Sequence, residues 1–142
     1  MNASAIAAFE STVQKSNEWV NEVMDEMCWD DPQRAYHGLR AVLHTLRDRL
    51  PLAEAVDLSS QLPMLVRGVY FEGWRPNRTV RPDRTKEEFL QHIFDAFPGD
   101  FEVDPEELVW AVFRVMARHI TKGEIDDIKA TLPVKFREFW PA

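Results

Sequence analysis

The sequence is poor in the features that assign a protein to a broad class at once. Its only cysteine is Cys28, which excludes an internal disulfide and is typical of a protein kept in a reducing cytoplasm. No apolar run approaches the ~20 residues that span a bilayer, and no basic start followed by a long apolar core marks a signal peptide. We therefore expect a cytoplasmic protein without membrane association. We expect Cys28 to be a small buried side chain beside Met24, Met27 and Trp29 rather than a reactive thiol.

Motifs for nucleophilic, phosphate or metal chemistry are also missing. The serines lie in no nucleophile-elbow context, and the five glycines are too scattered to cradle a phosphate. Glu88 and His92 are four residues apart, but a surface hydrogen bond explains that spacing better than a shared metal. The other histidines, which are His37, His44 and His119, form no compact ligand motif. The sequence therefore predicts no catalytic residue, no cofactor and no metal, which leaves an enzyme as the minority interpretation.

The charge balance argues against two classes of partner. The chain has 24 Asp and Glu against 17 Lys and Arg, a net charge of −7. An acidic surface repels nucleic acid and anionic membranes. The hydrophobic fraction of 45% and the charged fraction of 29% are those of an ordinary globular domain, and 142 residues suit one such domain.

The sequence contains an internal repeat whose two copies lie seventy positions apart. Residues Glu18–Tyr70 align with Glu88–Trp140 over 53 positions without a gap, and apolar positions stay apolar. Ten positions are identical: Glu18, Asp25, Asp30, Ala41, Val42, Glu54, Asp57, Leu62, Pro63 and Arg67, with their partners seventy residues later. A repeat of this kind constrains the architecture before any motif does.

Each copy contains one strongly amphipathic helix that begins at an Asp-Pro pair, Asp31-Pro32 or Asp104-Pro105. Their apolar stripes recur at the same offsets: Leu39, Val42, Leu43, Leu46 and Leu50, then Val109, Val112, Phe113, Met116 and Ile120. An earlier helix from about residue 9 to 28 is predicted to face the core through Phe9, Val13, Val20, Val23, Met24 and Met27. Pro63 and Pro133 predict the start of a short fourth helix in each copy.

No strand-like alternation is present, so the predicted fold class is all-α. We expect about eight helices arranged as two tandem pseudo-symmetric four-helix repeats, at about residues 9–74 and 85–140. Together they would form one compact domain, 1–142, with a linker rich in Arg and Pro at 74–84.

That linker carries the most unusual pattern in the chain. Arg75, Arg78, Arg81 and Arg84 recur every third residue after Trp74, so in a polyproline II conformation they would share one side. Arginine forks bind carboxylates and phosphates, which predicts a candidate strip for an acidic partner, a phosphorylated ligand or a nucleic acid. The alternative is that these arginines fold back onto the protein's own acidic helices.

A second set of charged residues recurs in both copies. Glu54, Asp57 and Arg67 are repeated as Glu124, Asp127 and Arg137. A carboxylate on the third helix that faces an arginine on the fourth would pin these two helices together. Because both copies keep the set, we interpret it as structural ion pairs rather than as one active site.

The spacing LRDRL…EA…L..QLP…RG.Y..GW, between Leu46 and Trp74, resembles the prokaryotic family of unknown function DUF2267. The likeness covers most of the chain and implies a small, all-helical, cytoplasmic bacterial protein. It carries no established activity, catalytic residue or cofactor. The second copy departs from the pattern, with MARHI in place of LRDRL and no GW ending.

These observations favour a non-enzymatic interaction module as the leading hypothesis. It would dock an acidic protein partner or a second copy of itself, through the linker or a groove between the halves. The alternative is a binding protein, possibly an enzyme, for a small anionic or phosphorylated ligand.

Overall fold

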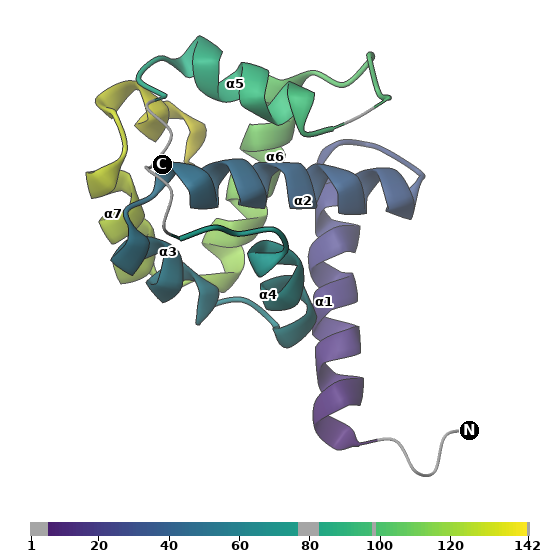
Figure 1. The fold of residues 1–142 in the computed structure, drawn as a ribbon. Helices are drawn as coiled ribbons and strands as arrows, with labels where there is room; N and C mark the ends of the chain where they lie inside the picture. The colour runs from purple at the N-terminus through teal and green to yellow at the C-terminus, as the bar shows by residue number, and fades with distance from the viewer. Residues whose placement is uncertain (1–5, 77–82, 98, 142) are drawn as a thin grey trace.

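The computed structural model describes residues 6–76, 83–97 and 99–141, which form seven α-helices, one 3-10 helix and no strand. The helices are α1 (Ala7–Glu26), α2 (Pro32–Arg49), α3 (Leu52–Ser59), α4 (Met64–Phe71), α5 (Lys86–Asp95), α6 (Pro105–His119), α7 (Lys122–Thr131) and η1 (Val134–Phe139). The all-α prediction is therefore confirmed (Figure 1). Among the described helices, none combines the length and the apolar character that crossing a membrane requires.

Both helices predicted from an Asp-Pro pair begin where the sequence places them. Asp31 precedes α2, and its Oδ1 accepts a hydrogen bond of 2.9 Å from the Gln33 amide. Asp104 precedes α6 and accepts from the Glu106 amide, also at 2.9 Å. The side chain thus pairs an amide that the helix cannot bond itself, and the proline that follows needs no donor.

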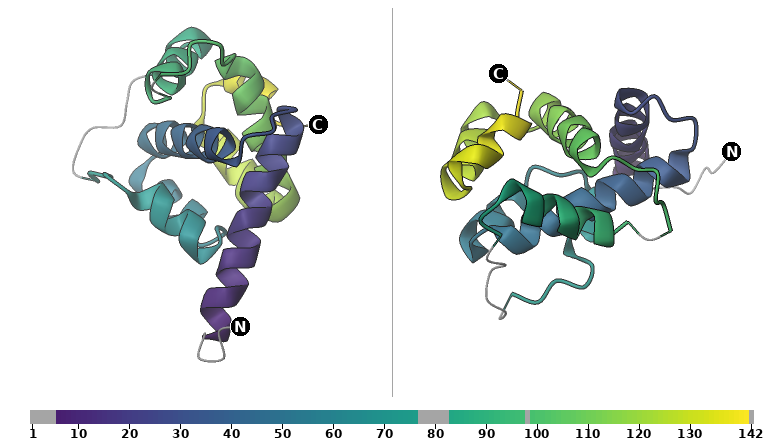
Figure 2. Two further views of the ribbon diagram at one scale, coloured as in Figure 1. Left: turned by 90° about the vertical axis from the view of Figure 1, so that its right-hand side faces the viewer. Right: turned by 90° about the horizontal axis from the view of Figure 1, so that it is seen from above.

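The core is built around α2 and α6. All ten stripe residues of these two helices are buried, none more than 5% exposed, so the predicted register is confirmed. Helix α2 contacts α5 on one side and α4 on the other, as the left view of Figure 2 shows. It therefore ties together segments from both parts of the chain.

The last helix differs from the prediction. Residues 134–139 form a 3-10 helix, with i to i+3 hydrogen bonds from the Phe136 amide to Pro133 and from the Trp140 amide to Arg137. Six residues are too few to repay the nucleation of an α-helix, so their aromatic side chains decide the conformation. Trp140 stacks on Phe113 with ring centroids 3.9 Å apart, and Phe139 is fully buried.

Helix α1 also corrects a prediction. Phe9 is 56% exposed and Val13 is 48% exposed, whereas the inward-facing residues of the helix are Thr12, Ser16, Trp19 and Val23. A helix of 20 residues is about 30 Å long. Its first turns project beyond the helices that it packs against (Figures 1 and 2).

Cys28 is exposed, so the prediction that it is buried is wrong. It follows the end of α1 with a φ of 55°, the left-handed conformation that turns the chain toward α2. Its amide bonds the Asp25 carbonyl, and the amide of Trp29 bonds that of Met24. The reversal directs Trp29 and Met27 toward the core and leaves the thiol in solvent.

Candidate interaction surface

The projecting end of α1 and the start of α4 expose five large apolar side chains. We call this set the apolar end: Ile6 (57% exposed), Phe9 (56%), Val13 (48%), Met64 (50%) and Leu65 (50%). The Leu65 amide donates a 3.1 Å hydrogen bond to Thr12 Oγ1, which fixes the start of α4 against α1. Since Thr12 is next to Val13 and one turn from Phe9, the exposed side chains of the two helices are neighbours.

The sequence explains why these side chains are left outside. In α1 the spacing that gives Ile6, Phe9 and Val13 continues in Val20 and Met24, which are partly buried against the core. One continuous apolar stripe is therefore covered at its C-terminal half and exposed at its N-terminal half.

Helix α4 shows the same division within two turns. Val66 and Tyr70 are buried and hold the helix down, and the Tyr70 hydroxyl donates to the Ala55 carbonyl at 2.7 Å. Met64 and Leu65 precede these anchors and lie half exposed.

The charge around the apolar end differs from that of the whole chain. Residues 6–17 contain one acid, Glu10, and one base, Lys15, whereas the chain has a net charge of −7. Arg67, the nearest charged residue of α4, is bound to main-chain carbonyl groups. This end is therefore close to neutral in an otherwise acidic protein.

The arginine strip predicted in the linker is described only at its two ends. Trp74 is partly buried, with its ring centroid 5.3 Å from that of Phe71. Arg75 and Arg84 are exposed, and neither joins an ion pair with another residue that the structure describes. Arg78 and Arg81 lie outside the described residues, so a shared side for the four arginines stays a prediction.

A buried aspartate anchors the C-terminal end of the linker. Asp83 is 1% exposed; its carboxylate lies 2.8 Å from His92 Nδ1, and its carbonyl accepts from Arg49 Nε at 2.8 Å. This contact was not predicted, because Asp83 stands in a stretch whose composition indicates a loop. His92 thus bonds Asp83.

The predicted ion pairs between the third and fourth helices are not among those that the described residues form. Arg67 instead donates from Nε to the Ser59 carbonyl at 2.9 Å and from Nη2 to the Leu62 carbonyl at 3.1 Å. These carbonyl groups stand at the end of α3, where the helix leaves them without a partner. Arg67 therefore closes the turn between α3 and α4 through the main chain.

Three of the four carboxylates assigned to those ion pairs meet one another instead. Glu54 of α3 faces Glu124 and Asp127 of α7, and one oxygen atom of each lies within 4.8 Å of the others. Helices α3 and α7 lie side by side in Figure 1. Arg137 is exposed and forms no ion pair within the described part of the chain.

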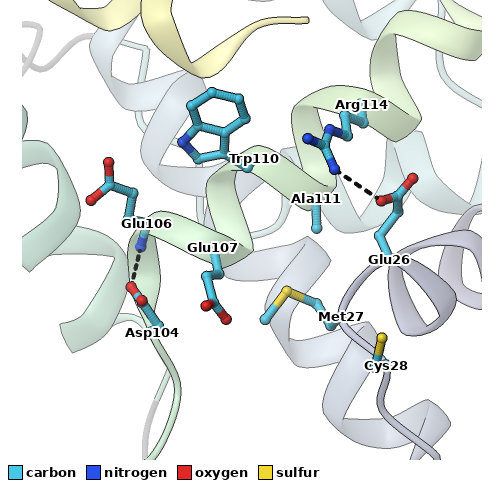
Figure 3. Close-up of a pocket in the computed structure, with 9 residues that line it drawn as sticks. All are labelled: Glu26, Met27, Cys28, Asp104, Glu106, Glu107, Trp110, Ala111 and Arg114. Atoms are coloured by element: carbon cyan, nitrogen blue, oxygen red, sulfur yellow. Dashed lines mark hydrogen bonds and ion pairs between the residues drawn. The ribbon is translucent and has the colours of Figure 1, made fainter.

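Two open hollows are lined by acidic side chains. The first, about 500 Å³, lies between the end of α1 and the start of α6 (Figure 3). Its carboxylates are Glu26, Asp104, Glu106 and Glu107. Its single cation, Arg114, lies 3.4 Å from Glu26 and over the ring of Trp110. Because the lining is acidic and its arginine is paired, this hollow does not favour an anionic ligand.

The second hollow, about 590 Å³, has the same character. Its only arginine, Arg34, bonds Asp100 at 2.5 Å and lies 4.0 Å from the centre of the Trp29 ring. The pKa of Arg34 is raised, chiefly by the hydrogen bond to Asp100. The side chain of Phe101 lines the same hollow and is 84% exposed.

The motif LRDRL forms a structural link between α2 and α4. Arg47 is 5% exposed and donates from Nη1 to the carbonyl groups of Tyr70 and Glu72, both at 2.8 Å. His44, one turn earlier, lies 2.6 Å from the Val69 carbonyl, and burial lowers its pKa. These polar side chains of α2 thus satisfy the last carbonyl groups of α4.

A family model described as "Uncharacterized conserved protein (DUF2267)" matches residues 16–139. The chain belongs to the DUF2267 family. The matched residues include the buried Arg47, the carboxylates of α3 and α7 and the exposed start of α4. They leave out Ile6, Phe9 and Val13, so the DUF2267 match covers only the α4 part of the apolar end. No curated protein matches the chain.

Proposed function

We propose that this DUF2267 protein is a non-enzymatic helical interaction module that associates with a second copy of itself through the apolar end. The observation that carries the proposal is the half exposure of five large apolar side chains at the projecting end of α1 and the adjoining start of α4. Contiguous exposed apolar surface of this kind marks interaction sites in monomeric proteins. A twofold arrangement places the same surface on both partners, so one surface is sufficient.

The charge distribution favours a second copy over a different acidic surface as the occupant. Two molecules of charge −7 repel one another most where their acids gather and least at the neutral end of α1. Lys15 and Glu10 also give this segment both signs of charge, so two such helices meet without a net like-charge contact.

The available apolar area suggests a moderate affinity. Five half-exposed side chains offer on the order of 400 Å² per molecule, or about 20 kcal/mol for two molecules at 25 cal/mol per Å². Association costs about 4–15 kcal/mol in lost freedom, before side-chain ordering. The remainder of about 5–16 kcal/mol, reduced further by side-chain ordering, is sufficient for a micromolar dissociation constant, which requires about 8 kcal/mol.

Sedimentation velocity over a concentration series tests the proposal. The wild type should shift from monomer to dimer between low micromolar and several hundred micromolar protein. The double variant Phe9→Asp/Val13→Asp should stay monomeric, because each aspartate would have to be desolvated in the interface. Circular dichroism shows whether the variant keeps its helices.

The matched control is Phe101→Asp/Val134→Asp, which removes two apolar side chains that are even more exposed, at 84% and 72%. Neither residue belongs to the apolar end, so this variant should dimerise like the wild type. A wild type that stays monomeric throughout, or an equal effect of both variants, contradicts the proposal.

A second candidate partner is an acidic protein that binds the linker. It is favoured by the exposure of Arg75 and Arg84, which have no ion-pair partner in the described part of the chain. The variant Arg75→Glu/Arg84→Glu should then lose an acidic protein that the wild type retains from a host lysate, and the loss should match that caused by high salt. If the wild type and the variant retain the same proteins from the lysate at low salt, this candidate is excluded.

We also infer that the fold consists of two copies of one four-helix unit, α1–α4 and α5–η1. Helices α2 and α6 end at Arg49 and His119, which are seventy positions apart, like the prolines before α4 and η1. Superposition of the two units in an experimental structure should bring the ten identical positions into register.

A further inference from the structure

Three carboxylates from two helices converge where α3 meets α7. One oxygen atom each from Glu54, Glu124 and Asp127 lies within 4.8 Å of the other two. A calcium ion binds oxygen ligands at about 2.3–2.6 Å, so its ligands stand at most about 5 Å from one another. The three side chains already have the spacing that one such ion requires.

The inner oxygen atoms of this cluster lack a donor when both glutamates are ionised. Oε1 of Glu54 and Oε2 of Glu124 are both inaccessible to solvent, and a hydrogen bond between the two side chains requires a proton on one of them. Of the three side chains Glu124 is buried, Glu54 partly buried and Asp127 exposed. A buried carboxylate oxygen without a partner is costly, so this arrangement indicates a group that supplies positive charge.

The surrounding side chains that the structure describes do not supply that charge. Asp57 of α3 adds a fourth negative group, and the Tyr70 hydroxyl is directed to the Ala55 carbonyl. Lys122, at the start of α7, pairs with Asp126 at 2.9 Å on the exposed side of the helix. Arg67 bonds main-chain carbonyl groups.

Electrostatics confirm the imbalance. Burial, followed by the charges of Glu54, Asp57 and Asp127, raises the pKa of Glu124 to about 7. Burial, and then the charges of Asp127 and Asp57, likewise raises the pKa of Glu54. The raised pKa values show that these carboxylates repel one another when ionised, and a proton or a bound cation relieves that repulsion.

We propose that Glu54, Glu124 and Asp127 bind one divalent cation and so clamp α3 to α7. The donor set consists of carboxylate oxygen alone, without histidine or cysteine, which selects a hard cation such as Ca²⁺, Mn²⁺ or Mg²⁺ over Zn²⁺. Asp127 stands at the exposed side, where water completes the coordination. Glu54 and Glu124 are the same position in the two sequence copies, so the cation joins the first half of the chain to the second.

Calorimetric titration of chelator-treated full-length protein at pH 7.5 tests this site, with CaCl2 and MnCl2 as separate probes. The expected result is one bound ion per chain, with a melting temperature that rises with cation concentration. The variant Glu54→Gln/Glu124→Gln should lose the heat of binding and the rise in melting temperature. Asp126→Asn, on the exposed side of the same helix, should keep both.

A readout on the wild type alone covers the case in which the variant does not fold. Substoichiometric Mn²⁺ should selectively broaden the amide NMR signals of Ala55 and Ile125, which adjoin the two glutamates. Broadening spread over the acidic surface, or binding unchanged in the variant, overturns the proposal. Absence of binding by either cation at millimolar concentration also overturns it, and assigns a shared proton to the two glutamates.

Discussion

Glu124→Gln should stabilise the protein at alkaline pH in cation-free buffer. The pKa of Glu124 rises from an ordinary 4.5 to about 7, so the folded protein holds this proton more tightly than the unfolded chain does. The resulting stability is present in full below about pH 4.5, falls as the pH rises, and is lost above pH 7. Each pKa unit corresponds to 1.36 kcal/mol, so the full shift gives ~3.4 kcal/mol as an upper limit.

Solvent access through the exposed Asp127 reduces this figure, and we expect about 2 kcal/mol. Glutamine is neutral at every pH, so the variant does not lose this contribution. Its free energy of unfolding should match that of the wild type at pH 5 and exceed it at pH 8.

Urea unfolding at pH 5 and pH 8, with a chelator present, measures the effect. Other titratable groups of the protein also change protonation in this range. Their contributions cancel in the difference between the variant and the wild type. Asp126→Asn is the matched control and should show the wild-type pH dependence. If Glu124→Gln also keeps that dependence, the glutamates do not share the enclosed environment described above.

Four further variants test other parts of the structure by chemical denaturation. Leu46→Ala and Met116→Ala, which truncate fully buried side chains, should each cost about 2–5 kcal/mol, and a neutral result would disprove the register of that helix. Arg47→Met should cost about 3–5 kcal/mol, because it leaves the Tyr70 carbonyl unpaired. A cost below about 1 kcal/mol would show that the methylene groups of Arg47, which methionine replaces, hold α2 to α4 rather than the hydrogen bonds of its guanidinium. Cys28→Gly should stabilise by about 1 kcal/mol, since glycine accepts a φ of 55° without strain, and destabilisation would contradict that backbone conformation.

Local chemistry was sufficient to predict most of the helical framework. The stripes of α2 and α6 follow the i, i+3, i+4 spacing, and both are buried as predicted. Asp31 and Asp104 cap their helices because an aspartate side chain reaches an amide two residues ahead, whatever the rest of the chain does. The seventy-residue repeat extended these predictions from one half of the sequence to the other.

Periodicity could not show where a helix has a neighbour. The stripe of α1 is regular from Ile6 to Met27, yet only its second half meets the core. Cys28 was predicted to be buried from its apolar neighbours, but the reversal after α1 turns it into solvent. In both cases the decisive quantity is the length and direction of α1 relative to the rest of the molecule.

The carboxylate cluster depended most on the tertiary structure. From the sequence, Arg67 was the natural partner of Glu54, because the two lie on consecutive short helices. The fold directs Arg67 to the carbonyl groups at the end of α3 and places Glu54 against Glu124, seventy residues away. Caps and apolar stripes arise from contacts within a few residues and can be predicted from the sequence. The meeting of two glutamates depends on how α3 packs against α7, and only the assembled core decides that.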